Sequence, residues 1–112
     1  MRRHLTDPER TFVRQMLAIA GLSRSPYARQ VPSLRVVGKC DCGCPTVDFA
    51  TPAAGKPLVD AYARTKQGEV VGAILWEKEG QLSGLELYSM AADPKELPHS
   101  NTLSLDPAPH AG

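Results

Sequence analysis

Three strand-like runs separated by two short glycine turns constrain the fold of this chain more than any other feature. The runs are 58–66, 69–78 and 81–88, and the turns centre on Gln67-Gly68 and Glu79-Gly80. Two-residue turns that contain glycine are typical of tight hairpins, which join neighbouring antiparallel strands. The sequence therefore predicts an antiparallel β-meander in the second half of the chain.

The middle run is apolar on both faces. Residues 70–76 read VVGAILW, so consecutive positions are hydrophobic and the alternation of a half-exposed strand is missing. Such a strand belongs in the interior of a sheet, and we expect a helix to cover one of its faces. The run is also far shorter than the roughly 20 residues needed to cross a bilayer. We therefore expect no membrane segment, and the basic N-terminus, with no apolar stretch behind it, is not typical of a secretory signal.

An amphipathic helix is predicted near the start of the chain. Thr6 with Glu9 forms a capping-box pattern, and Asp7 followed by Pro8 is an alternative helix start at almost the same place. Apolar residues then recur at spacings of three and four, and Gly21 is a suitable terminator. The apolar positions are Phe12, Val13, Met16, Leu17, Ile19 and Ala20.

Shorter elements follow this helix. Ser25-Pro26 predicts a second helical segment from Pro26 to about Gln30, which Pro32 ends. Alternating residues predict strands over 33–40 and 46–50. Two prolines and a glycine within 51–57 predict a loop.

These elements predict an α+β protein, with one or two N-terminal helices packed on a mainly antiparallel sheet of about five strands. With 112 residues, 42% hydrophobic and 22% charged, the chain has the length and composition of one globular domain, 1–112. We expect residues 1–5 and 106–112 to be loose termini. Leu103 and Leu105 are expected to pack against the sheet.

Charge is distributed unevenly along the chain. Residues 1–68 contain eleven Lys and Arg against five Asp and Glu, whereas residues 69–112 contain two against seven. The net charge of +1 therefore conceals a basic first part and an acidic second part. The two parts either neutralise each other in the folded domain or create a field that attracts an oppositely charged partner.

The three cysteines lie in a short turn, Cys40-Asp41-Cys42-Gly43-Cys44-Pro45. Structural zinc sites usually space cysteines two to four residues apart and need a fourth ligand, which would have to come from His4, His99 or His110. A reactive thiol would need nearby cations, and Asp41 opposes Lys39. A structural corner with small buried cysteines is favoured over both. Cys40, Cys42 and Cys44 thus remain weak metal candidates, no cofactor is expected, and an odd cysteine count favours a reducing cytosol.

Catalytic motifs are missing from the sequence. It contains no phosphate-binding glycine loop, no nucleophile elbow and no metalloprotease helix motif, and its three histidines are scattered. Asp48 and Asp60 could form a carboxylate pair, although acids on strands more often face solvent. We therefore expect a protein that is not an enzyme.

Two surface patterns point to binding. The first pattern is a set of arginines, which favour contacts with phosphate, but few aromatic residues are available to stack on bases. Two of the arginines, Arg10 and Arg14, also fit the solvated side of the first helix. A nucleic-acid partner is therefore not favoured. The arginines are Arg2, Arg3, Arg10, Arg14, Arg24, Arg29 and Arg35.

The second pattern combines acidic and aromatic residues in the second part of the chain. Complementary charge speeds association, and aromatic residues carry much of the binding energy in protein interfaces. These residues predict a surface for a basic protein partner. They are Trp76, Glu77, Glu79, Glu86, Tyr88, Asp93 and Glu96.

The cysteine turn, the preceding Leu34 to Lys39 and the hairpin from Gly72 to Tyr88 resemble a family of small bacterial cytosolic proteins. The resemblance covers residues 6–105. In size and organisation this family is similar to the immunity proteins of contact-dependent growth inhibition and other polymorphic toxin systems. The resemblance implies a cytoplasmic protein that binds and neutralises a cognate toxin domain. The charge of this chain departs from the resemblance, because immunity proteins against nuclease toxins are often acidic overall, whereas here only the second part of the chain is acidic.

An alternative hypothesis remains open. The chain would then be a small metal-binding or nucleic-acid-binding module that uses the cysteine turn or the arginine-rich first part. The sequence does not determine the oligomeric state.

Overall fold

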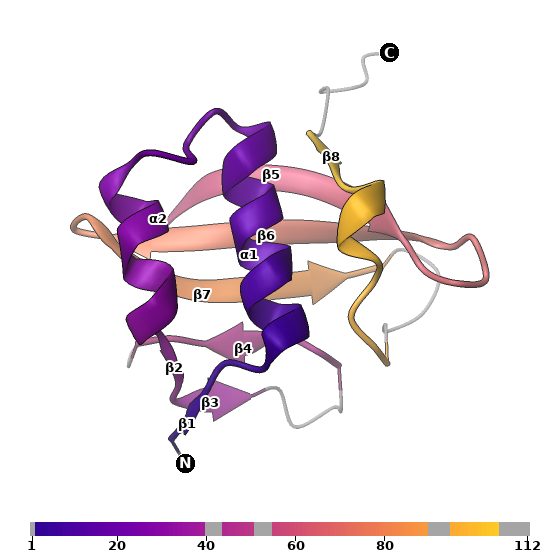
Figure 1. Ribbon diagram of the computed structural model, residues 1–112. Coiled ribbons are helices and arrows are strands. Elements are labelled where there is room, and N and C mark those ends of the chain that lie inside the picture. The colour runs from indigo at the N-terminus through magenta and orange to yellow at the C-terminus, as the bar shows by residue number, and fades with distance from the viewer. Residues whose placement is uncertain (1, 40–43, 51–54, 90–94, 106–112) are drawn as a thin grey trace.

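The computed structural model describes residues 2–39, 44–50, 55–89 and 95–105. Helices and strands follow one another as an α+β chain (Figure 1). The helices are α1 (Asp7–Ile19) and α2 (Pro26–Gln30), with short 3-10 turns η1 (Val31–Ser33) and η2 (Ser100–Thr102). The strands are β1 (Arg3–His4), β2 (Arg35–Val36), β3 (Gly38–Lys39), β4 (Val47–Asp48), β5 (Lys56–Arg64), β6 (Val70–Lys78), β7 (Gln81–Tyr88) and β8 (Ser104–Leu105).

The described strands form a six-stranded sheet in the order β3-β4-β7-β6-β5-β8, and β1 pairs with β2 in a small second sheet. All neighbouring strands are antiparallel. The predicted meander is confirmed as β5-β6-β7, and β6 lies in the interior of the sheet as its apolar sequence predicted. The predicted α+β class is therefore confirmed.

Both helices begin where the sequence predicted. The Thr6 hydroxyl accepts a hydrogen bond from the Glu9 backbone N–H at 3.2 Å, and the Glu9 carboxylate accepts one from the Thr6 N–H at 2.8 Å. This reciprocal capping box satisfies N–H groups that have no partner within the helix. Gly21, with φ +76°, follows the last turn in the left-handed conformation that glycine adopts most easily.

Helices and sheet form two layers. Figure 1 shows α1 crossing β5, β6 and β7, with α2 and η2 on the same side of the sheet. The apolar stripe of α1 is fully buried against the sheet, where Ala73, Leu75 and Leu85 are also buried. The buried residues of α1 are Phe12, Val13, Met16 and Leu17. Among the described residues, no helix is long and apolar enough to cross a membrane.

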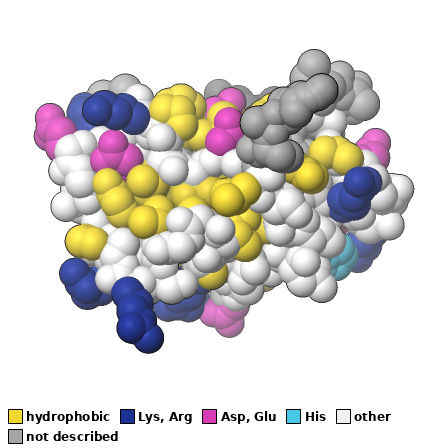
Figure 2. Space-filling model, turned by 90° about the horizontal axis from the view of Figure 1, so that it is seen from above, with side chains coloured by type: hydrophobic (Ala, Val, Ile, Leu, Met, Phe, Trp, Pro, Cys, Tyr) yellow, Lys and Arg dark blue, Asp and Glu magenta, His cyan; other side chains and the backbone are white. Residues whose placement is uncertain are grey.

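Some hydrophobic surface remains at the edge of this core. Seen from above, hydrophobic side chains gather in the middle of the surface, over the end of α1 and β5 (Figure 2). Ile19 in α1, Ala20 and Leu22 just after it, and Leu58 in β5 are only partly buried. Leu103 is buried as expected, whereas Leu105 in β8 is 46% exposed.

The N-terminal end differs from its prediction. Residues 1–5 were expected to be loose, but Arg3 and His4 pair with Val36 and Arg35, and Leu5 is buried in the core. The Arg3 guanidinium also holds both oxygens of the Glu9 carboxylate, each at 2.9 Å. Residues 106–112 lie outside the described part of the chain.

The predicted strand over 33–40 is also different. It is divided between β2, which pairs with β1, and β3, which pairs with β4 in the large sheet. The segment 33–40 therefore contributes one short strand to each of the two sheets.

The Arg3–Glu9 contact predicts a dependence of stability on pH. Burial raises the pKa of Glu9, but hydrogen bonds from Arg3 and Thr6 lower it by more, so the pKa lies below its ordinary value. The same contact raises the pKa of Arg3. Glu9 therefore stabilises the fold above its unfolded-state pKa of about 4.3, and this stabilisation is lost as the pH falls through the lower folded-state pKa.

The measurement is the free energy of unfolding from urea titrations between neutral and acidic pH. Glu9→Gln keeps the capping geometry but removes the titrating group, so its stability should fall less with acidification than that of the wild type. Glu79→Gln, at an exposed turn position, is the matched control and should follow the wild type. Parallel curves for Glu9→Gln and the wild type would contradict this role of Glu9.

Candidate functional site

The six-stranded sheet has one face that no described helix covers. Along β6, Val71, Ala73 and Leu75 are buried toward the helices, whereas Ile74 and Trp76 point the other way and are only partly buried. We call this side, opposite α1 and α2, the outer face. Figure 1 shows that the helices lie on the other side.

Strand register arranges the outer face in three rows, each running across neighbouring strands. Adjacent strands are about 4.8 Å apart, so the side chains of one row are close neighbours. The first row is Asp48, Gly84 and Trp76, the second is Glu86, Ile74 and Asp60, and the third is Tyr88, Gly72 and Tyr62. The rows place acidic, aliphatic and aromatic side chains next to one another on a single surface.

Trp76 and Glu86 are joined directly across the first two rows. The indole Nε1 of Trp76 donates a hydrogen bond to Oε1 of Glu86 at 3.1 Å. This bond satisfies the indole N–H and restrains a large aromatic side chain on the surface. The pair is therefore a pre-oriented group with an apolar body and a negatively charged edge.

Tyr88 covers Gly72 in the third row. A Cβ atom added at Gly72 would lie 2.2 Å from Cζ of the Tyr88 ring, so the ring rests where a side chain would otherwise stand. Tyr88 is 37% exposed, which makes it one of the large hydrophobic side chains that the fold leaves accessible. Glycine at position 72 thus determines where the tyrosine ring lies.

Gly72→Ala should move the Tyr88 ring without unfolding the protein. The ring is the far end of a side chain and can turn, so the cost should fall at the low end of the about 1–3 kcal/mol typical of overpacking. Removing a strand glycine returns about 0.5–1 kcal/mol. We expect a free energy of unfolding within about 1 kcal/mol of the wild type.

The same variant should show a clear change in the NMR signals of the Tyr88 ring. Gly68→Ala, at a turn with open space around it but φ +82°, provides a contrast in which strain arises from the backbone alone. Unchanged Tyr88 signals in Gly72→Ala would mean that the ring does not pack on this glycine.

The structure brings together three of the residues predicted for partner binding and separates others from them. Trp76, Glu86 and Tyr88 share the outer face. Glu77 points toward the helix side, where its Oε1 accepts hydrogen bonds from Tyr27 Oη and the Gly80 N–H, both at 3.1 Å. Partial burial, together with the hydrogen bond to Glu77, raises the pKa of Tyr27.

The remaining predicted residues do not join the three rows. Glu79 is exposed in the β6–β7 turn with φ 53°. Glu96 is exposed in the segment that leads to η2, and Asp93 lies outside the described residues. The compact candidate site is therefore smaller than the predicted set and lies on the sheet.

Two contributors to this face, Tyr62 and Gly72, are not identified from the sequence. Asp48 and Asp60 are named there as a possible carboxylate pair, but β7 and β6 lie between their strands. The alternation along β5 does indicate that Asp60 and Tyr62 face away from the core, because both alternate with the buried Val59, Ala61 and Ala63.

Charge on the outer face is acidic at its centre. Asp48, Asp60 and Glu86 lie in the first two rows, whereas Arg64 is at one end of β5 and Lys78 is at the far end of β6. The Arg64 guanidinium donates to the Gly68 carbonyl at 3.2 Å, which directs it toward the neighbouring turn. A basic surface would therefore meet complementary charge at the middle of this face.

The cysteine turn lies largely outside the described residues. Cys44 is described and buried, and Cys40 and Cys42 are not described. Within residues 2–39, 44–50, 55–89 and 95–105, no three His, Cys, Asp or Glu side chains are grouped as they would be around a metal ion. Because Cys40 and Cys42 lie outside the described residues, metal binding by the cysteine turn stays a prediction.

The arginines of the first part lie mainly on the helix side. Arg3 is paired with Glu9, Arg10 with Asp7, and Arg35 contacts His4. Arg14, Arg24 and Arg29 are exposed, and no ion pair links any of them to another described residue.

Comparison of the chain with protein-family models, curated proteins and solved structures finds no match.

Proposed function

We propose that this protein is a cytoplasmic inhibitor that binds a cognate bacterial toxin domain and neutralises it, without being an enzyme itself. The observation that supports the proposal is the outer face, where a restrained Trp76–Glu86 pair lies beside two further acids and an accessible tyrosine. Protein interfaces concentrate their binding energy in such aromatic residues, surrounded by polar groups.

The chemistry of the outer face favours a partner with a basic surface. Arginine and lysine side chains have aliphatic stems that can cover Ile74 and Trp76, while their charged ends reach Asp48 or Glu86. A guanidinium over the indole ring would add a cation–π contact. The occupant that this surface fits is therefore a protein patch rich in arginine and lysine.

A second copy of this chain is a poorer occupant. In a two-fold dimer through the outer face, each subunit would present the same acids to the other. Asp48, Asp60 and Glu86 would then meet like charges, which costs binding energy. Charge thus favours a different protein as the partner.

The alternative of a nucleic-acid-binding module receives less support. Arg3 and Arg10 are engaged in ion pairs with carboxylates. The aromatic residues that could stack on bases, Trp76 and Tyr88, lie on the acidic outer face, which repels phosphate. Trp76 and Tyr88 therefore lie on the opposite side of the sheet from the exposed Arg14, Arg24 and Arg29.

The test begins with a toxin domain encoded beside the gene for this protein. Co-expression of the two should restore the growth of cells that the toxin domain alone stops, and calorimetry should detect a complex whose Kd weakens with added salt. The proposal fails if no adjacent gene encodes such a domain, or if the purified proteins do not associate.

Charge reversal locates the interface on the fold. Glu86→Lys should weaken the complex strongly and reduce its salt dependence, because it removes a carboxylate from the centre of the outer face. Glu79→Lys makes the same charge change at the β6–β7 turn and is the matched control. Equal losses in both variants would place the interface elsewhere.

A further inference from the structure

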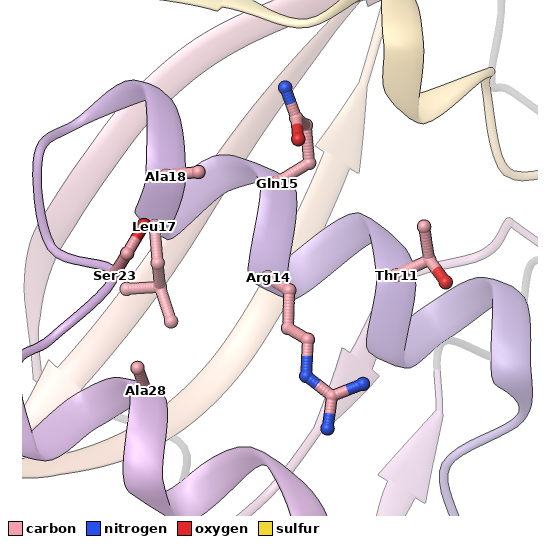
Figure 3. A pocket seen from close by; sticks show the side chains of 7 residues that line it. All are labelled: Thr11, Arg14, Gln15, Leu17, Ala18, Ser23 and Ala28. Carbon is pink, nitrogen blue, oxygen red and sulfur yellow. The ribbon is translucent and has the colours of Figure 1, made fainter.

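A cleft separates α1 from α2 on the side of the sheet opposite the outer face. Its volume is about 430 Å³, within the range of small-molecule sites. Figure 3 shows Leu17 of α1 and Ala28 of α2 pointing toward each other across it, with Arg14 extending from α1 toward α2. Thr11, Ala18 and Ser23 also line it.

The cleft is open because α2 is held by the β-hairpin and carries small residues toward α1. Tyr27 donates to Glu77 at 3.1 Å, and the Gln30 side-chain amide bonds to the Gly80 carbonyl at 2.9 Å and to the Leu82 N–H at 2.8 Å. These bonds fix α2 against the β6–β7 turn. The space between the helices is therefore built into the fold, because the Ala28 side chain that faces α1 is too short to fill it.

The lining has a distinct chemistry. The two alanines lie beside the buried Leu17, Gln15 and the hydroxyls of Thr11 and Ser23 add polar groups at separate points, and Arg14 provides a cationic fork suited to an oxyanion. None of the lining residues is acidic. The two acids of α1, Asp7 and Glu9, are near its other end and are occupied by Arg10 and Arg3.

Two further arginines are sequence neighbours of residues that line the cleft. Arg24 follows Ser23 and Arg29 follows Ala28, both exposed and without an ion pair to another described residue. In the view from above, basic side chains gather at the lower left, on the helix side (Figure 2). A negatively charged ligand would thus be attracted to the cleft before it contacts Arg14.

We propose that the cleft binds a small organic anion, a carboxylate or a phosphate monoester attached to a compact apolar group. The oxyanion pairs with the Arg14 guanidinium, and the apolar group lies in the cleft beside Ala28. This site is separate from the outer face and independent of the proposed toxin binding. A polynucleotide fits less well, because the lining contains a single arginine and no aromatic ring for stacking.

Titration of the full chain, followed by NMR of its backbone amides, tests the proposal. The probes are phenyl phosphate and phenylacetate, with neutral benzyl alcohol as the uncharged comparison. We expect saturable shifts at Ala18, Ser23 and Ala28 with a Kd of roughly 1–10 mM or tighter for at least one anion. The tighter of the two identifies the class of oxyanion, and benzyl alcohol should bind much more weakly.

Matched variants separate a site from general attraction to arginine. Arg14→Gln should weaken binding roughly tenfold or more, because it removes the charge-assisted hydrogen bonds. Arg35→Gln makes the same change on β2, away from the cleft, and should leave the Kd within about twofold. Both positions are exposed, so both variants should fold.

Several results would overturn the proposal. These are no shift at the cleft amides with either anion, equal binding of benzyl alcohol, and a Kd for Arg14→Gln equal to that of the wild type. Tighter binding of a short oligothymidylate strand to the same amides would assign the cleft to nucleic acid instead.

Discussion

Replacing Phe12 with alanine is expected to lower the free energy of unfolding by about 3–5 kcal/mol. Phe12 is 0% exposed and belongs to the stripe by which α1 packs on the sheet. Its removal loses the transfer energy of an aromatic side chain and leaves a cavity that the surrounding sheet cannot close. For a domain of this size the total stability is about 5–15 kcal/mol, so a large part of it depends on this side chain.

Urea denaturation followed by circular dichroism measures the effect. The midpoint should shift to lower urea without a change in the slope, because the surface exposed on unfolding is nearly the same. Thr11→Ala changes an exposed neighbour on the same helix and should stay within about 0.5 kcal/mol. A loss for Phe12→Ala no larger than that of Thr11→Ala would mean that α1 is not docked as described.

Local signals explain why α1 could be predicted from sequence. Thr6 and Glu9 satisfy each other's backbone N–H groups within four residues, and Gly21 supplies the positive φ that ends the helix. None of this requires knowledge of the rest of the fold. The meander was predictable for the same reason, since its turns contain Gly68 and Gly80, both with positive φ.

The first strands were harder to predict because their pairing is non-local. Nothing near Arg35 indicates that it pairs with His4, and the Arg3–Glu9 contact that fixes β1 joins two segments across the helix start. Period-two alternation recognises extended backbone over 33–40. It does not show that the backbone changes from one sheet to another between Val36 and Gly38.

The candidate site was only partly predictable for a related reason. Composition and position identified Trp76, Glu86 and Tyr88, but their relation depends on the register of β6 against β7. A register shift at Trp76 and Glu77 determines that Trp76 lies opposite Gly84 while Glu77 lies opposite Leu82. A one-residue change in register would exchange the two faces, and such shifts cannot be read from alternation alone.

In the proposed complex, replacing Trp76 with alanine is expected to weaken binding by about 2–4 kcal/mol, which is a roughly 30- to 1000-fold higher Kd. The variant loses the largest aromatic surface of the outer face. It also leaves the Glu86 carboxylate without the indole N–H that orients it at 3.1 Å. Because this is the one tryptophan of the chain, its fluorescence in the wild type should report burial by the partner directly.

Two further variants test whether the loss of binding comes from the Trp76 side chain itself or from general damage to the fold. Trp76→Phe keeps most of the apolar area but removes the N–H donor, so its Kd should lie between those of the wild type and Trp76→Ala. Val70→Ala removes an exposed apolar side chain from the same strand, outside the three rows, and should change the Kd little. Because Trp76 lies outside the buried core cluster, Trp76→Ala should lose far more binding than stability. If Trp76→Ala and Val70→Ala bind the partner alike, the outer face is not the interface, and the toxin-binding surface must be sought on another side of the sheet.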